Sequence, residues 1–281
     1  MRYNVLTKTL ALCSALCLCL AGCQKDAAPQ NGTGGEGAGE GQTTLTVGAS
    51  PSPHAEILEA AKPLLEEQGI VLEIQEFTDY ILPNEALEQG ELDANFFQHQ
   101  PYLDDFNEKN GTHLKSIGTV HFEAMGIYGG KCDDLEELKE GAQVGVPSDT
   151  TNEARALQLL ADRGLITLKE GVGLEATAKD IVENPKDIQL VELEAAVLPR
   201  SLPDLDIAVI NGNYALEGGV TDALLESEGA GSEAAQTFAN VVAVGEDDDR
   251  EALQTLIDVL QSDAIKEYIG ENYTTVFPAA E

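Results

Sequence analysis

The sequence predicts an α/β protein of two lobes, each a mostly parallel sheet flanked by helices, with a ligand cleft between the lobes. From residue 43 onward, short β-rich segments alternate with segments of helical periodicity. The alternation occurs in two series, separated by an extended stretch at residues 116–128. The chain has 281 residues, 43% of them hydrophobic, which suits about two domains of ~150 residues each.

The first series contains three strands and two helices before the extended stretch. In order, we expect a strand, a helix, a strand, a short helix and a strand at residues 45–49, 57–65, 71–77, 83–89 and 92–97. Pro63 lies inside the first of these helices and predicts a kink or a break there. The strand, helix, strand order predicts parallel pairing with a right-handed crossover.

The second series repeats the pattern. We expect strands at residues 143–147, 188–193, 206–210 and 241–244, and helices at 152–164, 176–183 and 249–268. Pro185 ends the second of these helices. The predicted lobes are therefore residues 44–122 with 242–281, and residues 123–241.

The amino terminus has the features of an export signal. Two basic residues, Arg2 and Lys8, accompany an apolar run at residues 10–20 that is too short to span a bilayer of ~30 Å. The run ends in Leu20-Ala21-Gly22-Cys23, which resembles the lipobox of bacterial lipoproteins. This resemblance implies a signal peptide at residues 1–22 and a lipid, such as palmitate, on Cys23. The alternative is an ordinary secretory signal without an anchor.

Residues 23–43 form the lipidated cysteine and a flexible tether rich in Gly and Glu. The chain would then be held on the extracytoplasmic face of the cell membrane through Cys23. The length and acidity of this tether favour the surface of a bacterium with a single membrane.

The charge of the chain excludes several kinds of partner. Its 16 basic and 50 acidic residues give a net charge of -34, which repels nucleic acid and anionic lipid. Residues 1–22 contain two basic and no acidic residues, so the mature chain has 14 against 50, or -36. Four of the five cysteines lie at or before Cys23, and Cys132 is alone in the rest of the chain. A framework of internal disulfides is therefore excluded.

Loops that follow the predicted strands are the candidate ligand contacts, because ligands of such sheets bind beyond the carboxyl ends of the strands. Residues 96–102 hold three of the fourteen Phe and Tyr residues and one of four histidines. With Tyr80 they could form an aromatic cage suited to a thioether or an aliphatic group. Strand alternation predicts that only one of Phe96 and Phe97 faces the cleft.

Polar loops complete the predicted site. The helix start at residues 150–155 offers backbone N–H groups and Arg155 to a ligand carboxylate. The alternative for Arg155 is a surface ion pair with Glu153 or Asp149. Asn211 follows a predicted strand and can accept from an ammonium group or donate to a carboxylate.

Several motifs resemble the NlpA family of methionine-binding lipoproteins. They are Phe77-Thr78-Asp79-Tyr80, Leu82-Pro83-Asn84-Glu85-Ala86-Leu87, Asp93-Ala94-Asn95-Phe96-Phe97-Gln98-His99, Pro101-Tyr102-Leu103, Val182-Glu183-Asn184-Pro185, Val191-Glu192-Leu193-Glu194-Ala195 and Leu198-Pro199-Arg200-Ser201. The likeness extends from about Thr44 to the end of the chain. It implies the type II periplasmic-binding-protein fold and a substrate-binding component of a methionine ABC importer, without catalysis and without a cofactor.

The resemblance also implies the ligand site and the partners. Tyr80, Phe97, His99 and Tyr102 would surround the ligand side chain. Asn152 and Arg155 would lie near the carboxylate, and Asn211 and Asn240 would fix the amino-acid head. The implied partners are L-methionine, an ABC permease with its ATPase, and the membrane through the lipid on Cys23.

Other functions are left open or excluded by the residues. The ligand could be D-methionine, a methionine derivative such as an oxidised methionine, or a short methionyl peptide. A metal-binding lipoprotein is the alternative of a different class, since His99, His113 and His121 could converge with Glu123 on zinc. No Gly-x-Ser-x-Gly hydrolase elbow is present. For a binding protein we expect the lobes to close about residues 122–128 and 240–244.

Overall fold

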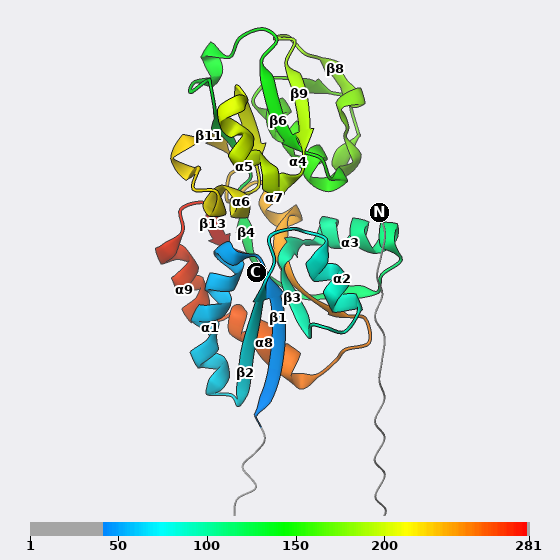
Figure 1. The fold of residues 1–281 in the computed structure, drawn as a ribbon, viewed down its shortest axis with the longest axis vertical. Coiled ribbons are helices and arrows are strands. Elements are labelled where there is room, and N and C mark those ends of the chain that lie inside the picture. Colours follow the sequence, from blue (N-terminus) through cyan, green and yellow to red (C-terminus); the bar gives the residue numbers. More distant parts are fainter. Residues whose placement is uncertain (1–41, 280–281) are drawn as a thin grey trace, which may run out of the picture. The chain divides into compact units, whose positions relative to one another are not determined.

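The computed structural model describes residues 42–279, which belong to one compact unit (Figure 1). The predicted signal peptide, the lipidation site Cys23 and nearly all of the tether lie outside the described residues. Among residues 42–279, no helix combines the length and apolar character needed to cross a bilayer.

The first lobe is built on a six-stranded sheet in the order β13-β4-β12-β3-β1-β2. Its strands are β1 (Thr43–Ala49), β2 (Ile70–Glu76), β3 (Ala94–His99), β4 (Leu114–Glu123), β12 (Ala239–Gly245) and β13 (Val276–Pro278). Its helices are the π-helical turn η1 (Pro51–Ala55), α1 (Glu56–Glu66), α2 (Leu82–Glu88), α3 (Gln100–Asn110), α8 (Glu251–Leu260) and α9 (Asp263–Asn272). Strand β1 pairs in parallel with β2 and β3, as the β-α-β prediction requires.

The second lobe is built on a five-stranded sheet in the order β11-β5-β10-β6-β9. Its strands are β5 (Gly126–Gly129), β6 (Gln143–Pro147), β9 (Gln189–Leu193), β10 (Ile207–Ile210) and β11 (Leu224–Ser227), beside a small two-stranded sheet of β7 (Thr167–Leu168) and β8 (Ile181–Glu183). Its helices of four residues or more are α4 (Thr150–Asp162), α5 (Leu198–Ser201) and α6 (Gly212–Glu217), whereas α7 (Glu233–Thr237) lies in the link back to the first lobe and packs on β4 and β12.

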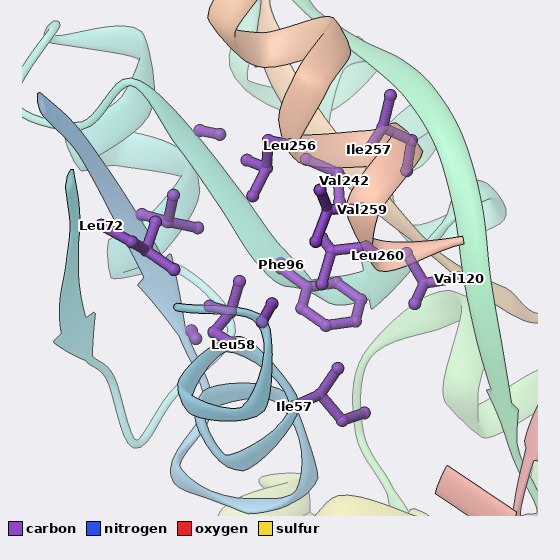
Figure 2. Close-up of a cluster of buried hydrophobic side chains, with 14 of the residues drawn as sticks. Ile57, Leu58, Leu72, Phe96, Val120, Val242, Leu256, Ile257, Val259 and Leu260 are labelled. Atoms are coloured by element: carbon purple, nitrogen blue, oxygen red, sulfur yellow. The ribbon is translucent and has the colours of Figure 1, made fainter. Parts of the chain in front are cut away.

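Apolar side chains from both series of elements form the core of the first lobe. Helices α1 and α8 bury their apolar faces against the sheet, where Phe96 is completely buried. Figure 2 shows Phe96 among Leu58, Val242 and Leu260, which come from a helix, a strand and a helix far apart in the sequence. This packing fixes β3, whose end carries much of the candidate site.

The two lobes are joined by two links, one short and extended and the other longer and containing helix α7. One link is Ala124 and Met125, between β4 and β5, and the other is residues 228–238, between β11 and β12. Strand β12 belongs to the first sheet from Ala239 on, three residues before the predicted boundary at residue 242. The lobe boundaries drawn from the sequence otherwise remain a prediction.

The sheets are mixed, whereas the sequence predicted mostly parallel ones. In the first sheet β12 runs antiparallel to both β3 and β4, and in the second sheet β5 runs antiparallel to β10 and β11. The reason lies in the connections, because β5 and β12 are the strands by which the chain enters the second lobe and returns. Neighbouring strands that are joined through a crossover connection, such as β1 and β2 through α1, retain the parallel direction.

Three predicted helical features are corrected. Residues 176–183 form a 3-10 turn and strand β8, because a capping box of Thr177 and Asp180 confines the turn to residues 178–180. Residues 249–268 form two helices, since Ser262 adopts an extended backbone and starts α9. Pro63 lies inside α1 and does not break it. In addition, the residues after His99 form helix α3, which the sequence did not predict.

Candidate ligand-binding site

One pocket between the lobes brings together all eight residues that the sequence predicted for the ligand site. The space between its lining atoms is about 340 Å³, part of which is open to solvent. The predicted residues that line it are Tyr80, Phe97, His99, Tyr102, Asn152, Arg155, Asn211 and Asn240. Four further lining residues were not predicted as ligand contacts, namely Gln98, Glu123, Gly212 and Asn213.

An aromatic wall occupies one side of the pocket. The ring of Tyr80 lies 5.9 Å from that of Phe97 and 5.7 Å from that of Tyr102, centroid to centroid. The Tyr80 hydroxyl donates to Asn213 Oδ1 at 2.5 Å, and the Tyr102 hydroxyl donates to the Tyr80 carbonyl oxygen at 3.0 Å. Because both hydroxyls are used within the protein, this wall offers mainly ring faces and edges to a ligand. Burial raises the pKa of both phenols, which stay neutral.

His99 links the end of β3 to the second lobe. Its Nδ1 accepts the backbone N–H of Tyr102, so His99 caps α3. Its Nε2 must then carry the proton, which it donates to Asn152 Oδ1 at 3.2 Å. Burial, followed by the nearby charge of Arg155, lowers the pKa of His99 to about 3. His99 is therefore a neutral, oriented donor between the lobes.

The helix start at α4 differs from the sequence prediction. The backbone N–H of Asn152 already donates to the capping residue Asp149 at 3.1 Å, and so does Asn152 Nδ2 at 2.9 Å. That N–H is therefore not free for a carboxylate, because an aspartate precedes the helix and caps it. Asn152 Oδ1 also accepts from Asn211 Nδ2 at 2.7 Å. Asn152 thus organises the pocket rather than offering vacant groups to it.

Arg155 is held from three sides. Its Nε and Nη2 donate to the two carboxylate oxygens of Glu228 at 2.9 and 2.6 Å. Its Nη2 also donates to the Glu123 carbonyl oxygen at 2.8 Å, and its guanidinium lies 4.4 Å from the ring centre of Phe238. The predicted alternative, a surface pair with Glu153 or Asp149, is wrong, because Arg155 is buried and its partner is Glu228.

Four polar groups of the pocket remain available to a ligand. Among residues 42–279 none of these atoms has a hydrogen-bond partner: Arg155 Nη1, Asn240 Nδ2, Glu123 Oε2 and Asn211 Oδ1. The last is also fully buried. The set contains two donors and two acceptors, one of each carrying a charge. A small zwitterion presents the complementary groups.

The predicted metal-binding arrangement is not found in the described part of the chain. His113 lies at the surface beside Glu88, and His99 is engaged with Asn152. Only His121 of the three predicted histidines approaches Glu123, in a buried group with His54.

The residues missed by the sequence prediction differ in whether the sequence contains a signal that could have identified them. Asn213 stands two residues after Asn211, so its position alone could have pointed to it. Glu123 lies within the predicted extended stretch at residues 116–128 and was considered there only as a possible zinc ligand. Glu228 lies in a Gly- and Glu-rich region without periodicity. Nothing in that segment indicated that it would pair with Arg155.

The two lobes, the mixed sheets and the pocket between them define a periplasmic-binding-protein fold with a site for a small ligand. The family model described as NlpA lipoprotein matches residues 45–280. The chain therefore belongs to the NlpA lipoprotein family, which is a family of binding proteins rather than enzymes.

Curated and structural relatives cover nearly the whole chain. A protein of Salmonella typhimurium named D-methionine-binding lipoprotein MetQ is 41% identical over 267 residues, covering 92% of this chain and 93% of that protein. A nutrient-binding protein from Burkholderia cenocepacia, solved bound to methionine, is 38% identical with a TM-score of 0.79, covering 84% of this chain and 100% of that one. Lipoprotein Tp32 from Treponema pallidum is 37% identical with a TM-score of 0.79, over 85% and 100%.

Proposed function

We propose that this protein captures free methionine, in the L form, and delivers it to the permease of an ABC importer. The observation that carries the proposal is the pocket itself, in which vacant donors and acceptors for an amino-acid head lie beside an aromatic wall. A methionine-bound relative with a TM-score of 0.79 supports the ligand class.

The head of the amino acid would be recognised by its two charges. Arg155 Nη1 and Asn240 Nδ2 are the donors for the carboxylate, and an arginine so fixed loses little freedom on binding. Glu123 Oε2 and Asn211 Oδ1 are the acceptors for the ammonium group. Free amino acids satisfy both pairs, whereas a peptide amide in place of either charge would leave one pair partly unpaired.

The side chain of the ligand would lie against Tyr80, Phe97 and Tyr102. Sulfur–ring contacts contribute ~0.3–1.5 kcal/mol each, and a flexible thioether adapts to an irregular wall. The neutral state of both tyrosines keeps charge away from this part of the pocket.

Delivery would follow from closure of the lobes and from the anchor. The chain passes between the lobes at Ala124 and Met125 and again at residues 228–238, so closure would occur there. The predicted crossing at residues 240–244 lies instead within β12 of the first sheet. The lipid on Cys23 would hold the protein on the extracytoplasmic face, at the surface of a single-membrane bacterium, where the closed form meets the permease.

Titration calorimetry of the purified mature chain tests the ligand. We expect L-methionine to bind most tightly, with D-methionine, methionine sulfoxide, a methionyl dipeptide and leucine as comparison ligands. Heat from another of these ligands but none from L-methionine would overturn the assignment. Because relatives carry the name D-methionine-binding, tighter binding of D-methionine would keep the ligand class and reverse the stereochemistry. Uptake of labelled methionine by vesicles holding the permease tests delivery.

A further inference from the structure

Two buried imidazoles, those of His54 and His121, contact the carboxylate of Glu123 and do not line the pocket. His54 Nε2 lies 3.0 Å and His121 Nε2 lies 2.8 Å from the same oxygen, Glu123 Oε1. Both histidines are 0% exposed and Glu123 is 5% exposed. His54 comes from η1, and the other two residues come from the end of β4.

The contacts fix the protonation of both rings. Glu123 Oε1 is an acceptor, so each Nε2 facing it must carry a proton. His54 Nε2 also lies 3.1 Å from Asn240 Oδ1, a second acceptor. The Nδ1 atoms of His54 and His121 are fully buried without a partner. A protonated Nδ1 would leave a buried donor unpaired, so both rings are neutral Nε2–H tautomers.

The same atoms could be considered as ligands of a metal ion, since they lie within 4.8 Å of one another. A histidine that ligates a metal almost always donates its other N–H to an acceptor. Neither Nδ1 has such an acceptor. The surroundings therefore suit hydrogen bonds to Glu123 and do not suit a metal site.

The direction of the carboxylate follows from this arrangement. With Oε1 held by two donors, Oε2 is the oxygen left for the pocket, where Gly212 packs against it. The two Nε2–H groups that face Oε1 favour the ionised form of the Glu123 carboxyl group. His54 also orients Asn240, so that its Nδ2 faces away from the imidazole.

We propose that His54 and His121 are positioning residues that hold Glu123 ionised and aim its free oxygen at the α-ammonium group of the ligand. His54 additionally sets the amide of Asn240, and so it coordinates both charged ends of the amino acid. This inference rests on the proposed function, because it assigns to the pocket a ligand with an ammonium group.

The test compares two ligands that differ only in that group. They are L-methionine and 4-(methylsulfanyl)butanoate, which lacks the ammonium. We expect His121→Leu to reduce the affinity ratio of the two ligands by about tenfold or more, the effect of a lost hydrogen bond to a charged group. His121→Gln, whose Nε2 can still donate to Glu123, should keep most of the ratio. An equal loss of affinity for both ligands would overturn the proposal.

His113→Leu is the matched control, because His113 also faces a carboxylate, that of Glu88, but lies at the surface outside the pocket. It should leave the ratio unchanged. A fall of the ratio in this variant as large as in His121→Leu would also overturn the proposal.

A second measurement needs no variant and no ligand. Nitrogen-15 NMR of the imidazole rings in the mature protein should show Nε2–H tautomers for His54 and His121. A neutral Nδ1–H tautomer or an imidazolium at either residue would overturn the assigned hydrogen bonds. If the unmodified protein binds no methionine, the proposed function fails, while Nε2–H signals would still support the placement of the Glu123 carboxylate.

Discussion

Arg155 carries the only lysine or arginine charge among the pocket-lining residues that the structure describes. Its Nε and Nη2 are committed to Glu228, so its direction is set before a ligand arrives. Such an arrangement reduces the entropy lost on binding. Removing the guanidinium should therefore affect both the binding of the ligand and the stability of the fold.

Arg155→Ala should weaken methionine binding by at least ~1.5 kcal/mol, the low end for a hydrogen bond to a charged group. It should also destabilise the fold by roughly 3–5 kcal/mol, because the buried Glu228 carboxylate loses its partner. Calorimetry and urea unfolding measure the two effects. The double variant Arg155→Ala, Glu228→Gln should recover much of the stability but not the affinity. Full affinity in either variant would exclude a role for Arg155 in carboxylate binding.

Gly212 is required by close approach to Glu123. A Cβ at this position would lie 2.9 Å from Glu123 Cβ, closer than real contacts allow. Gly212→Ala should therefore displace Glu123, cost ~1–3 kcal/mol of stability and weaken methionine binding. Gly270→Ala in α9, where a Cβ meets no atom within 4 Å, is the control and should be neutral or stabilising. Equal effects of both changes on binding would refute this explanation.

His99 should make the stability of the protein depend on pH. Its pKa is about 3 in the folded protein and ordinarily 6.5. Below pH 6.5 the unfolded chain takes up a proton that the folded chain does not, so this residue lowers stability as the pH falls towards 3. His99→Asn keeps a side chain that can cap α3 and lacks this effect. As the pH falls from 6.5 towards 3, the free energy of unfolding of the variant should rise relative to that of the unmodified protein by at most ~1.4 kcal/mol per pH unit. Urea unfolding at pH 7.0, 5.5 and 4.5 measures this difference. A constant difference would contradict the assigned pKa.

At the scale of elements, segments with strong local signals were predictable. Strand β1, helix α1 and strand β2 combine β-branched or helically spaced apolar residues with clear ends, and they occur where expected. Helix α3 was not predicted, because only Tyr102, Leu103 and Phe106 of its eleven residues are buried and its apolar face is narrow. Pro101 near its start nevertheless fits a helix. Residues 181–183 were predicted to be helical but form strand β8, because they pair with strand β7.

The candidate site was predictable to the extent that its residues follow strands. Tyr80, His99 and Asn211 belong to loops that the strand order alone selected, and all three line the pocket. Asn240 lies within β12, so no loop rule identifies it, and only the family resemblance did. Glu228 and His54 depend on long-range contacts that local sequence does not encode.

At the scale of the whole molecule, side-chain bonds join the lobes across the pocket. The Tyr80 hydroxyl of the first lobe donates to Asn213 of the second, and Tyr214 donates to the Thr78 carbonyl oxygen. The bond from His99 to Asn152 is a third connection between the lobes at the pocket. The closed arrangement of the two lobes should therefore depend on individual hydroxyl groups, such as those of Tyr80 and Tyr214.

Tyr80→Phe keeps the ring and removes the hydroxyl bond to Asn213. We expect methionine to dissociate several-fold faster, because a typical hydrogen bond contributes ~0.5–1.5 kcal/mol. Stopped-flow displacement measures the rate. Tyr273→Phe removes a hydroxyl that bonds to Glu56 within the first lobe and should leave the rate unchanged. A faster rate in both variants would show that the effect is not specific to closure.

The tyrosines of the pocket have a further consequence for how this protein can be observed. The chain contains seven tyrosines and no tryptophan. Three of the seven, Tyr80, Tyr102 and Tyr214, lie together, with ring centres 4.8 Å apart for Tyr80 and Tyr214 and 5.7 Å for Tyr80 and Tyr102. With no indole to dominate the ultraviolet emission, a large share of that emission comes from rings beside the ligand space. Capture and release of a ligand should therefore be visible in the intrinsic fluorescence of the unlabelled protein.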